Sequence, residues 1–364
     1  MRRILLDARR TRQMSIGMKQ YARELTARLP VVAPEFEYVP FAEGPNFGWR
    51  EQVALPLAAA RFGASLVHFM SIYTPLISTR WSVVTVHDLI HLLFPQQFKG
   101  KVGPYYRIVV RRACRRAARV ITDDERTVED LERFLGVDPK KVRVVALGTD
   151  FQSGDASLDV AQRSAPRSLG MTEDSSHSSL GMTKQSSLGM TEHPYFLYVG
   201  NHRAHKNLQT LLAAWRALPP ECEVDLCLTG PDDFGGVLQQ ASNGRRRAYA
   251  VGDISEQELS ERYRGAIALV HPALREGFGL PMLEAMATGT PVVASAEAVP
   301  RVLESAALLF PAKDVGTLTE TLMRLLADQG LRERLVNEGR MTARLLTWDR
   351  CARETAAVYH EVLG

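Results

Sequence analysis

The sequence lacks the features that mark several large classes of protein. Its 364 residues contain no apolar run of the roughly 18 residues that a membrane-spanning helix requires. The opening MRRILLD leads directly into a strand pattern, without the longer apolar segment of a secretory signal peptide. We therefore expect a cytoplasmic protein.

Cysteine is also scarce. None of the four cysteines forms a C-x-x-C pair or has a histidine partner at metal-binding spacing. This distribution favours buried thiols over zinc ligands or disulfides. The four are Cys114, Cys222, Cys227 and Cys351.

Acidic residues are absent from residues 99–119, where we predict a helix. The net charge of the whole chain is only +4, which does not indicate nucleic-acid binding, and no RNP or KH pattern is present. Two interpretations stay open: one solvated helix face, or attraction to an anionic membrane surface at about 1 kcal/mol per basic residue. The basic residues are Lys99, Lys101, Arg107, Arg111, Arg112, Arg115, Arg116 and Arg119.

The length predicts two domains of ordinary size, each with its own core. With 45% hydrophobic and 24% charged residues, the composition is that of a soluble globular protein. Residues 152–193 differ, because Ser-Leu-Gly-Met-Thr occurs three times there and bulky apolar side chains are few. Such a stretch cannot bury enough surface to fold, so we interpret it as a flexible linker between the domains.

The most informative stretch is EGFGLPMLEAMATGTPVVAS at residues 276–295. Continuous apolar runs at residues 266–272 and 290–294 predict buried parallel strands on either side of it. Pro281 suits the first turn of a helix and Gly289 suits the position just past its end. The pattern therefore predicts a strand, a loop, a helix and a second strand.

The loop of this unit is suited to a phosphate group. Gly277 and Gly279 let backbone N–H groups approach a ligand closely, and the helix N-terminus adds partial positive charge. The simplest alternative is an ordinary Rossmann-like turn with two solvated glutamates, Glu276 and Glu284. Met282 stands where the dinucleotide-binding fingerprint has its third glycine, so that fingerprint does not apply.

The whole string is more specific than its glycines. Two glutamates separated by seven residues enclose Gly-Phe-Gly-Leu-Pro, and Ala-Met-Ala-x-Gly-x-Pro-Val-Val follows. This string closely resembles the signature of retaining family 4 glycosyltransferases (glycosyl transferases group 1), which have the GT-B fold. The resemblance covers nearly all of the chain outside residues 152–193.

The resemblance implies an α/β protein with two Rossmann-like parallel-sheet domains that face a central cleft. Residues 1–151 would form the acceptor domain and residues 194–347 the nucleotide-sugar donor domain. Residues 348–364 would form a helix that crosses back to the first domain.

Other segments resemble parts of the family's site. Val-Val-Thr-Val-His-Asp places His87 at the tip of a strand, beside the donor sugar. Ser-Ile-Gly resembles the turn before the first helix of the family, and within it only Gly17 matches the family pattern. In the loop at residues 201–207, Lys206 matches a cation that binds the donor diphosphate, and Arg203 is a second candidate. Asp123 and Asp124 stand where the family usually has a hydroxyl residue.

By this resemblance Glu276 and His87 are the expected catalytic residues. Glu276 would contact sugar hydroxyls near the developing positive charge, His87 would face the sugar from the other domain, and Glu284 would bind the ribose. The sequence contains no Asp-x-Asp motif, so we expect metal independence, no cofactor, and diphosphate binding by cations and backbone dipoles. The expected donor-binding residues are Gly17, Arg203, Lys206, Gly277, Phe278, Gly279, Leu280 and Glu284.

The implied function is retaining transfer of a sugar, with mannose on a guanine nucleotide as the expected donor, to a cell-surface glycan or lipid-linked acceptor. A nucleotide-sugar epimerase or a non-catalytic sugar-nucleotide-binding protein of the same fold are the alternatives. A glycoside hydrolase also uses paired carboxylates, but it has no use for a diphosphate cradle. The expected partners are the nucleotide sugar, the acceptor and an anionic membrane at its inner face, without nucleic acid.

Overall fold

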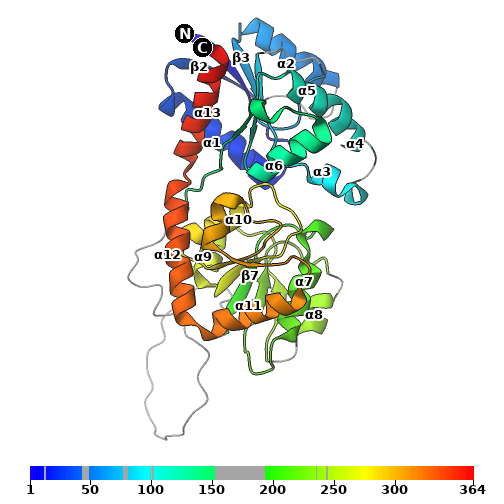
Figure 1. The fold of residues 1–364 in the computed structure, drawn as a ribbon, viewed down its shortest axis with the longest axis vertical. Helices are drawn as coiled ribbons and strands as arrows, with labels where there is room; N and C mark the ends of the chain where they lie inside the picture. Colours follow the sequence, from blue (N-terminus) through cyan, green and yellow to red (C-terminus); the bar gives the residue numbers. More distant parts are fainter. Residues whose placement is uncertain are drawn as a thin grey trace, which may run out of the picture.

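The computed structural model describes residues 1–11, 14–42, 49–76, 81–98, 100, 102–151, 193–234, 236–242 and 245–364. Residues 152–192 of the predicted linker lie outside these ranges, as do Lys99 and Lys101. The chain forms two α/β domains, one above the other along the long axis of the molecule (Figure 1). None of the helices in the described ranges has the length and hydropathy of a membrane span.

The first domain is built on a six-stranded sheet whose neighbouring strands all pair in parallel. Its central strands, β3 (Leu66–Phe69) and β4 (Ser82–Thr85), are buried on both faces, as expected of a parallel sheet between layers of helices. The strand order is β2-β1-β3-β4-β5-β6. The strands are β1 (Arg2–Asp7), β2 (Phe36–Phe41), β3 (Leu66–Phe69), β4 (Ser82–Thr85), β5 (Arg119–Thr122) and β6 (Val142–Val144).

The helices of the first domain include one correction to the sequence prediction. The expected basic helix is three segments, α4, a π-helical turn and α5, and Arg119 belongs to strand β5 instead, where its Nε lies 3.0 Å from Glu361. The helices are α1 (Ile16–Val32), α2 (Trp49–Arg61), α3 (Ile90–Leu93), α4 (Val102–Tyr105), the π-helical turn η2 (Tyr106–Val110), α5 (Arg111–Arg116) and α6 (Glu125–Asp130), followed by η3 (Leu131–Leu135); short 3-10 turns are η1 (Pro95–Gln97) and η4 (Pro139–Lys141).

The second domain repeats the architecture with a second parallel sheet of order β12-β11-β10-β7-β8-β9. Its strands are β7 (Tyr195–Tyr198), β8 (Asp225–Leu228), β9 (Ala248–Ala250), β10 (Ala268–His271), β11 (Val292–Ser295) and β12 (Leu308–Phe310). Its helices are η5 (Ala204–Lys206), α7 (Leu208–Ala217), α8 (Val237–Ala241), α9 (Glu256–Gly265), α10 (Leu280–Ala287), η6 (Arg301–Ala306), α11 (Val315–Ala327) and α12 (Gln329–Leu345).

The last helix, α13 (Trp348–Leu363), leaves the second domain and packs along α1 of the first (Figure 1). Trp348 and Tyr359 are fully buried in this contact. Tyr359 Oη lies 2.6 Å from Nδ1 of His68, which burial and, to a smaller extent, His87 keep neutral by lowering its pKa to about 3. The predicted two-domain fold with a helix crossing back is confirmed.

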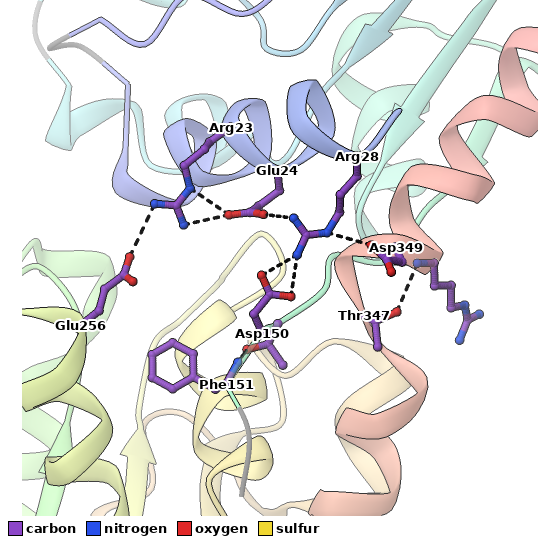
Figure 2. A network of polar contacts seen from close by, with 10 residues as sticks. Arg23, Glu24, Arg28, Asp150, Phe151, Glu256, Thr347 and Asp349 are labelled. Carbon is purple, nitrogen blue, oxygen red and sulfur yellow. Dashed lines mark hydrogen bonds and ion pairs between the residues drawn. The ribbon is translucent and has the colours of Figure 1, made fainter. Parts of the chain in front are cut away.

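The chain passes between the domains at two places that lie side by side, and Arg28 of α1 contacts both (Figure 2). Its guanidinium lies 2.6 Å from Asp150 at the end of the first domain and 2.9 Å from Asp349 at the start of α13. A Cβ on Gly148 would lie 2.1 Å from the Trp348 nitrogen, so the two passages touch backbone to backbone. We call Arg28, Asp150 and Asp349 the hinge triad.

Candidate functional site

The predicted strand, loop, helix and strand at residues 268–295 is confirmed by β10, α10 and β11. Gly279 directly precedes α10 with φ at +72°, and a Cβ there would lie 2.2 Å from the Met282 side chain. Gly289, with φ at +79°, follows the end of the helix. The N-cap residue Gly279 has no side chain to cap α10, Pro281 has no N–H, and the Met282 N–H donates to the Gly279 carbonyl at 2.9 Å, so Leu280 is the residue of this turn whose N–H can face an anion.

Glu276 lies in this loop within a cluster of charged side chains. Lys206 Nζ donates to Glu276 Oε2 at 2.5 Å, and His271 Nε2 lies 3.3 Å from the same oxygen. Burial raises the pKa of Glu276, but Lys206 and His271 lower it by more, so the carboxyl is ionised well below its usual range. The structure thus brings together the predicted Glu276 and Lys206, and it adds His271.

Lys206 reaches this cluster because of the residue that follows it. Asn207 has left-handed backbone geometry, with φ at +56°, and its side-chain amide donates to the carbonyls of Pro272 and Ala312. This amide ties the turn η5 to the end of β10, the strand that carries His271. An asparagine is among the few residues that adopt this backbone conformation readily.

His87 follows β4 in the first domain, as predicted. Its Nδ1 lies 2.6 Å from Oδ2 of Asp123, which follows the neighbouring strand β5, and the His87 and Tyr21 rings form a T-shaped pair with centroids 4.7 Å apart. Burial lowers the pKa of His87, but Asp123, Asp88 and the backbone of Met70 raise it by more. Nε2 makes no hydrogen bond of ordinary geometry to a described residue.

Glu284 lies on α10, 7% exposed, and accepts a 2.9 Å hydrogen bond from the Tyr263 hydroxyl of α9. Burial is the main reason why its pKa is raised to about 7, and the Tyr263 bond opposes this rise. Glu284 can therefore change its charge near neutral pH, which Glu276 cannot. Tyr263 was missed by the sequence analysis.

The two domains meet at this loop. A Cβ on Gly277 would lie 3.1 Å from the His87 carbonyl oxygen, and a Cβ on Gly17 would lie 3.4 Å from the Leu280 side chain. Phe278, by contrast, is 3% exposed and part of the hydrophobic core, so its side chain is not available to a ligand. The structure therefore brings predicted residues of both domains together.

Arg203 has a different neighbour. Its guanidinium lies over the ring of Phe98 in the first domain, 5.4 Å from the ring centre. Close by, Nδ1 of His205 lies 2.9 Å from the side-chain oxygen of Gln97, also in the first domain. The loop that carries Lys206 is thus attached to the first domain by Arg203 and His205. The donor-binding role of Arg203 stays a prediction.

Known families cover both halves of the chain. Residues 16–153 match the family described as Glycosyltransferase Family 4, and residues 183–342 match the one described as Glycosyl transferases group 1. Together these matches include more than four fifths of the chain. The chain belongs to glycosyltransferase family 4.

Several curated proteins resemble this family 4 chain. It is 33% identical to O-antigen chain mannosyltransferase B of Escherichia coli over 174 residues, 45% of each chain. It is 26% identical to O-antigen chain mannosyltransferase RfbU of Salmonella typhimurium over 219 residues, 59% of this chain and 52% of the other. The chain thus spans about half the length of these two relatives.

Solved structures share the fold of this family 4 chain. Sucrose-phosphate synthase from Thermosynechococcus elongatus superposes with a TM-score of 0.70 at 21% identity, with 99% of each chain covered. Anabaena Alr3699/HepE in complex with UDP and glucose gives 0.69 at 16% identity, covering 99% of this chain and all of the other. These likenesses establish the GT-B fold.

Proposed function

We propose that this family 4 chain is a retaining, metal-independent hexosyltransferase that uses a nucleotide-diphosphate sugar. One observation carries the proposal: the loop that holds Glu276 against Lys206 in the second domain approaches His87 of the first domain at Gly277 and leads into the helix α10. The acceptor is a cell-surface glycan or a lipid-linked precursor of one. The O-antigen mannosyltransferases among the relatives support this acceptor class and support mannose as the sugar.

The leaving diphosphate needs positive charge around it. Lys206, 7% exposed, supplies a cation, and the dipole of α10 together with the Leu280 N–H at its start supplies partial positive charge. Such groups stabilise charge that develops in the transition state without reorganising. Lys206 would exchange part of its contact with Glu276 for the diphosphate when the donor binds.

The sugar develops positive charge as the bond to the diphosphate breaks. Glu276 is ionised at all ordinary pH values because Lys206 and His271 lower its pKa, so it can stabilise that charge. His87 directs Nδ1 to Asp123, which fixes the orientation of the ring next to the Gly277 backbone, and His87 would face the sugar from the first domain. Glu284 would accept hydrogen bonds from the ribose.

Retention fits an attack on the same face of the sugar that the diphosphate leaves, with the diphosphate accepting the acceptor's proton. We assign no protein nucleophile, because the Glu276 carboxylate is engaged by Lys206 and His271. The absence of an Asp-x-Asp motif from the sequence supports metal independence. The relatives are transferases, so the epimerase and the non-catalytic alternatives are not favoured.

We also propose that the chain works in the cytoplasm and contacts the inner face of the membrane through its first domain. The support is a group of exposed arginines on one continuous segment with Ile108, which is 61% exposed. Apolar and basic side chains on one surface favour an anionic bilayer. The arginines are Arg107, Arg111, Arg112, Arg115 and Arg116.

The decisive experiment screens the purified chain against UDP-, GDP- and ADP-sugars by thermal shift. The best ligand is then offered with a lipid-linked acceptor, with and without EDTA, and the anomeric configuration of the product is read by NMR. We expect stabilisation by one donor, transfer that survives EDTA, and retention. Inverted product would refute the retaining mechanism, loss of transfer in EDTA would refute metal independence, and no stabilisation by any donor would refute the function.

A further inference from the structure

The loop that carries Glu276 is attached to the first domain on both sides of that residue. Before it, Arg275 Nη2 donates to Asp130 Oδ2 at 2.6 Å and to the Arg126 carbonyl at 3.0 Å. After it, the Gly277 backbone lies against the His87 carbonyl. The catalytic glutamate is therefore enclosed between two contacts with the opposite domain.

One short piece of the first domain, residues 123–130, is linked to both contacts. Asp123, which bonds His87, directly precedes the capping residue of α6, and Asp130, which bonds Arg275, is the last residue of α6. Asp124 accepts the Arg126 N–H at 2.9 Å and so caps this helix. The capped helix α6 thus connects Asp123, which orients His87, with Asp130, which binds Arg275, the residue before Glu276.

The Arg275–Asp130 pair is better shielded from water than other ion pairs at this interface. Its side chains are 21% and 11% exposed, whereas Arg301, 3.3 Å from Glu125, is 55% exposed and its partner 60%. Exposed pairs contribute little, and partly buried pairs with good geometry contribute more. Burial raises the pKa of Asp130 above its ordinary value, and Arg275 opposes this rise without cancelling it.

We propose that Arg275 and Asp130 are positioning residues for the transfer reaction. They fix the position of the Glu276 loop relative to His87, so that the two catalytic side chains face one sugar at the same time. The inference rests on the proposed function. The carboxylate of Glu276 is bound by Lys206 and His271 of its own domain, and Arg275, the residue before it, supplies an ion pair that relates the Glu276 loop to the first domain.

The first test is the Asp130→Asn variant of the full chain, with its folding checked by thermal unfolding. Since a displacement of about 1 Å can cost about 100-fold in rate, we expect kcat to fall between about 10- and 100-fold. The Kd of UDP or GDP, whichever the wild type binds, should change less than about twofold, because the proposed diphosphate contacts lie in the second domain. Arg275→Lys, which keeps the charge but not the paired donors, should give an intermediate loss.

The matched control is Glu304→Gln. This variant removes the charge that Glu304 presents to Arg126 at 2.6 Å. The Arg126–Glu304 pair joins the same helix α6 to the second domain, but Glu304 lies 28 residues after Glu276 in the sequence. We expect its kcat to stay within about threefold of the wild type, as for a partly exposed pair. An unchanged kcat in Asp130→Asn, or an equal loss in Glu304→Gln, would overturn the proposal.

A second measurement does not need turnover. Spin labels on the exposed positions of Lys140→Cys and Lys313→Cys, one in each domain, report the interdomain distance in a Cys222→Ser background. The distance distribution should broaden in Asp130→Asn and stay narrow in Glu304→Gln. A wild type that turns over no nucleotide sugar refutes the proposed function, whereas an unchanged distribution in Asp130→Asn refutes the positioning role.

Discussion

His87 Nδ1 lies 2.6 Å from Asp123 Oδ2, and the Asp123 side chain is 1% exposed. This contact fixes which ring nitrogen of His87 carries the proton when the ring is neutral, and it favours the protonated ring. The sequence analysis treated Asp123 only as a departure from the family pattern. In the structure it orients a predicted catalytic residue.

Asp123→Asn should destabilise the protein in a pH-dependent way. The raised pKa of His87 contributes stability that is present below the ordinary value of 6.5 and is lost as pH rises through the folded-state pKa. Breaking a buried pair costs roughly 3 kcal/mol, so we expect that loss near pH 6 and a smaller one near pH 9. Urea unfolding at both pH values measures it, with Asp138→Asn on an exposed turn as the control. Equal losses at both pH values would contradict the assignment.

Glu276→Gln keeps the size of the side chain and removes its charge. Because the charge is proposed to act where positive charge develops on the sugar, kcat should fall about 100-fold or more, a loss of about 2.7 kcal/mol of transition-state stabilisation. Steady-state kinetics at saturating acceptor measures this, and the exposed Glu320→Gln on α11 is the control. If Glu276→Gln kept the wild-type kcat, Glu276 would not be the residue that stabilises the charge on the sugar.

Donor affinity should depend on the ionisation of Glu284. Ribose hydroxyls donate to the ionised carboxylate, and the pKa of about 7 means that roughly a tenth is ionised at pH 6 and nine tenths at pH 8. The Kd of the nucleotide sugar should therefore tighten about tenfold between these values. Calorimetry measures this directly. Glu284→Gln should weaken binding, abolish its pH dependence and leave kcat little changed, since an interaction of equal strength in the ground and transition states affects KM alone.

The raised pKa of Glu284 should also make the stability of the protein depend on pH. The native state holds the Glu284 proton more tightly than the unfolded chain, so stability is lost as pH rises from the ordinary value of 4.5 through about 7. Glu284→Gln removes this loss. Its melting temperature should exceed that of the wild type at pH 8 and match it at pH 5, and the reverse order would show that burial does not raise the pKa of Glu284.

Gly148→Ala should disturb the place where the two passages touch. The added Cβ meets the backbone of Trp348 at 2.1 Å and of Thr347 at 2.2 Å, so rotamer changes cannot relieve the clash. We expect a loss of about 3 kcal/mol or more, at the upper end of overpacking costs. Gly103→Ala, where nothing lies within 4 Å, is the matched control. Chemical unfolding of both variants measures the difference, and equal stability would exclude a close approach here.

Replacing three arginines by glutamine at positions 107, 111 and 115 should weaken vesicle binding. Each exposed arginine contributes about 1 kcal/mol at an anionic surface, and binding should fade above about 0.15 M salt. Cosedimentation with anionic and neutral vesicles measures it. The control removes Arg334, Arg344 and Arg353 from α12 and α13. Equal binding to both vesicle types would leave the alternative of a solvated helix face.

The sequence was sufficient for the architecture because local patterns determine it. Continuous apolar runs such as residues 292–295 are typical of strands buried on both faces, and Pro281 and Gly289 mark the ends of α10. Ser255 and Glu258 form a capping box that could have located α9 as well.

The partners of the site could not be predicted in the same way. Asp123, Tyr263 and His271 contact residues between 5 and 36 positions away, and no spacing rule specifies such contacts. The predicted basic helix was wrong at its C-terminal end because the chain must enter β5 at Arg119, and charge alone carries no information on where a helix ends. Local structure is readable from the sequence, whereas neighbours across the fold depend on the packing.

The hinge triad holds α1 at Arg28, far from the end of the helix that faces the second domain. Near the N-terminal end of α1, Gly17 faces Leu280 at the start of α10. Arg28 lies 11 residues later, about 16 Å along the helix axis at about 1.5 Å per residue. A rotation of roughly 10° about Arg28 would therefore displace the far end by about 3 Å. That displacement is as long as a hydrogen bond, so a small rotation at Arg28 would be enough to separate or to join Gly17 and the start of α10.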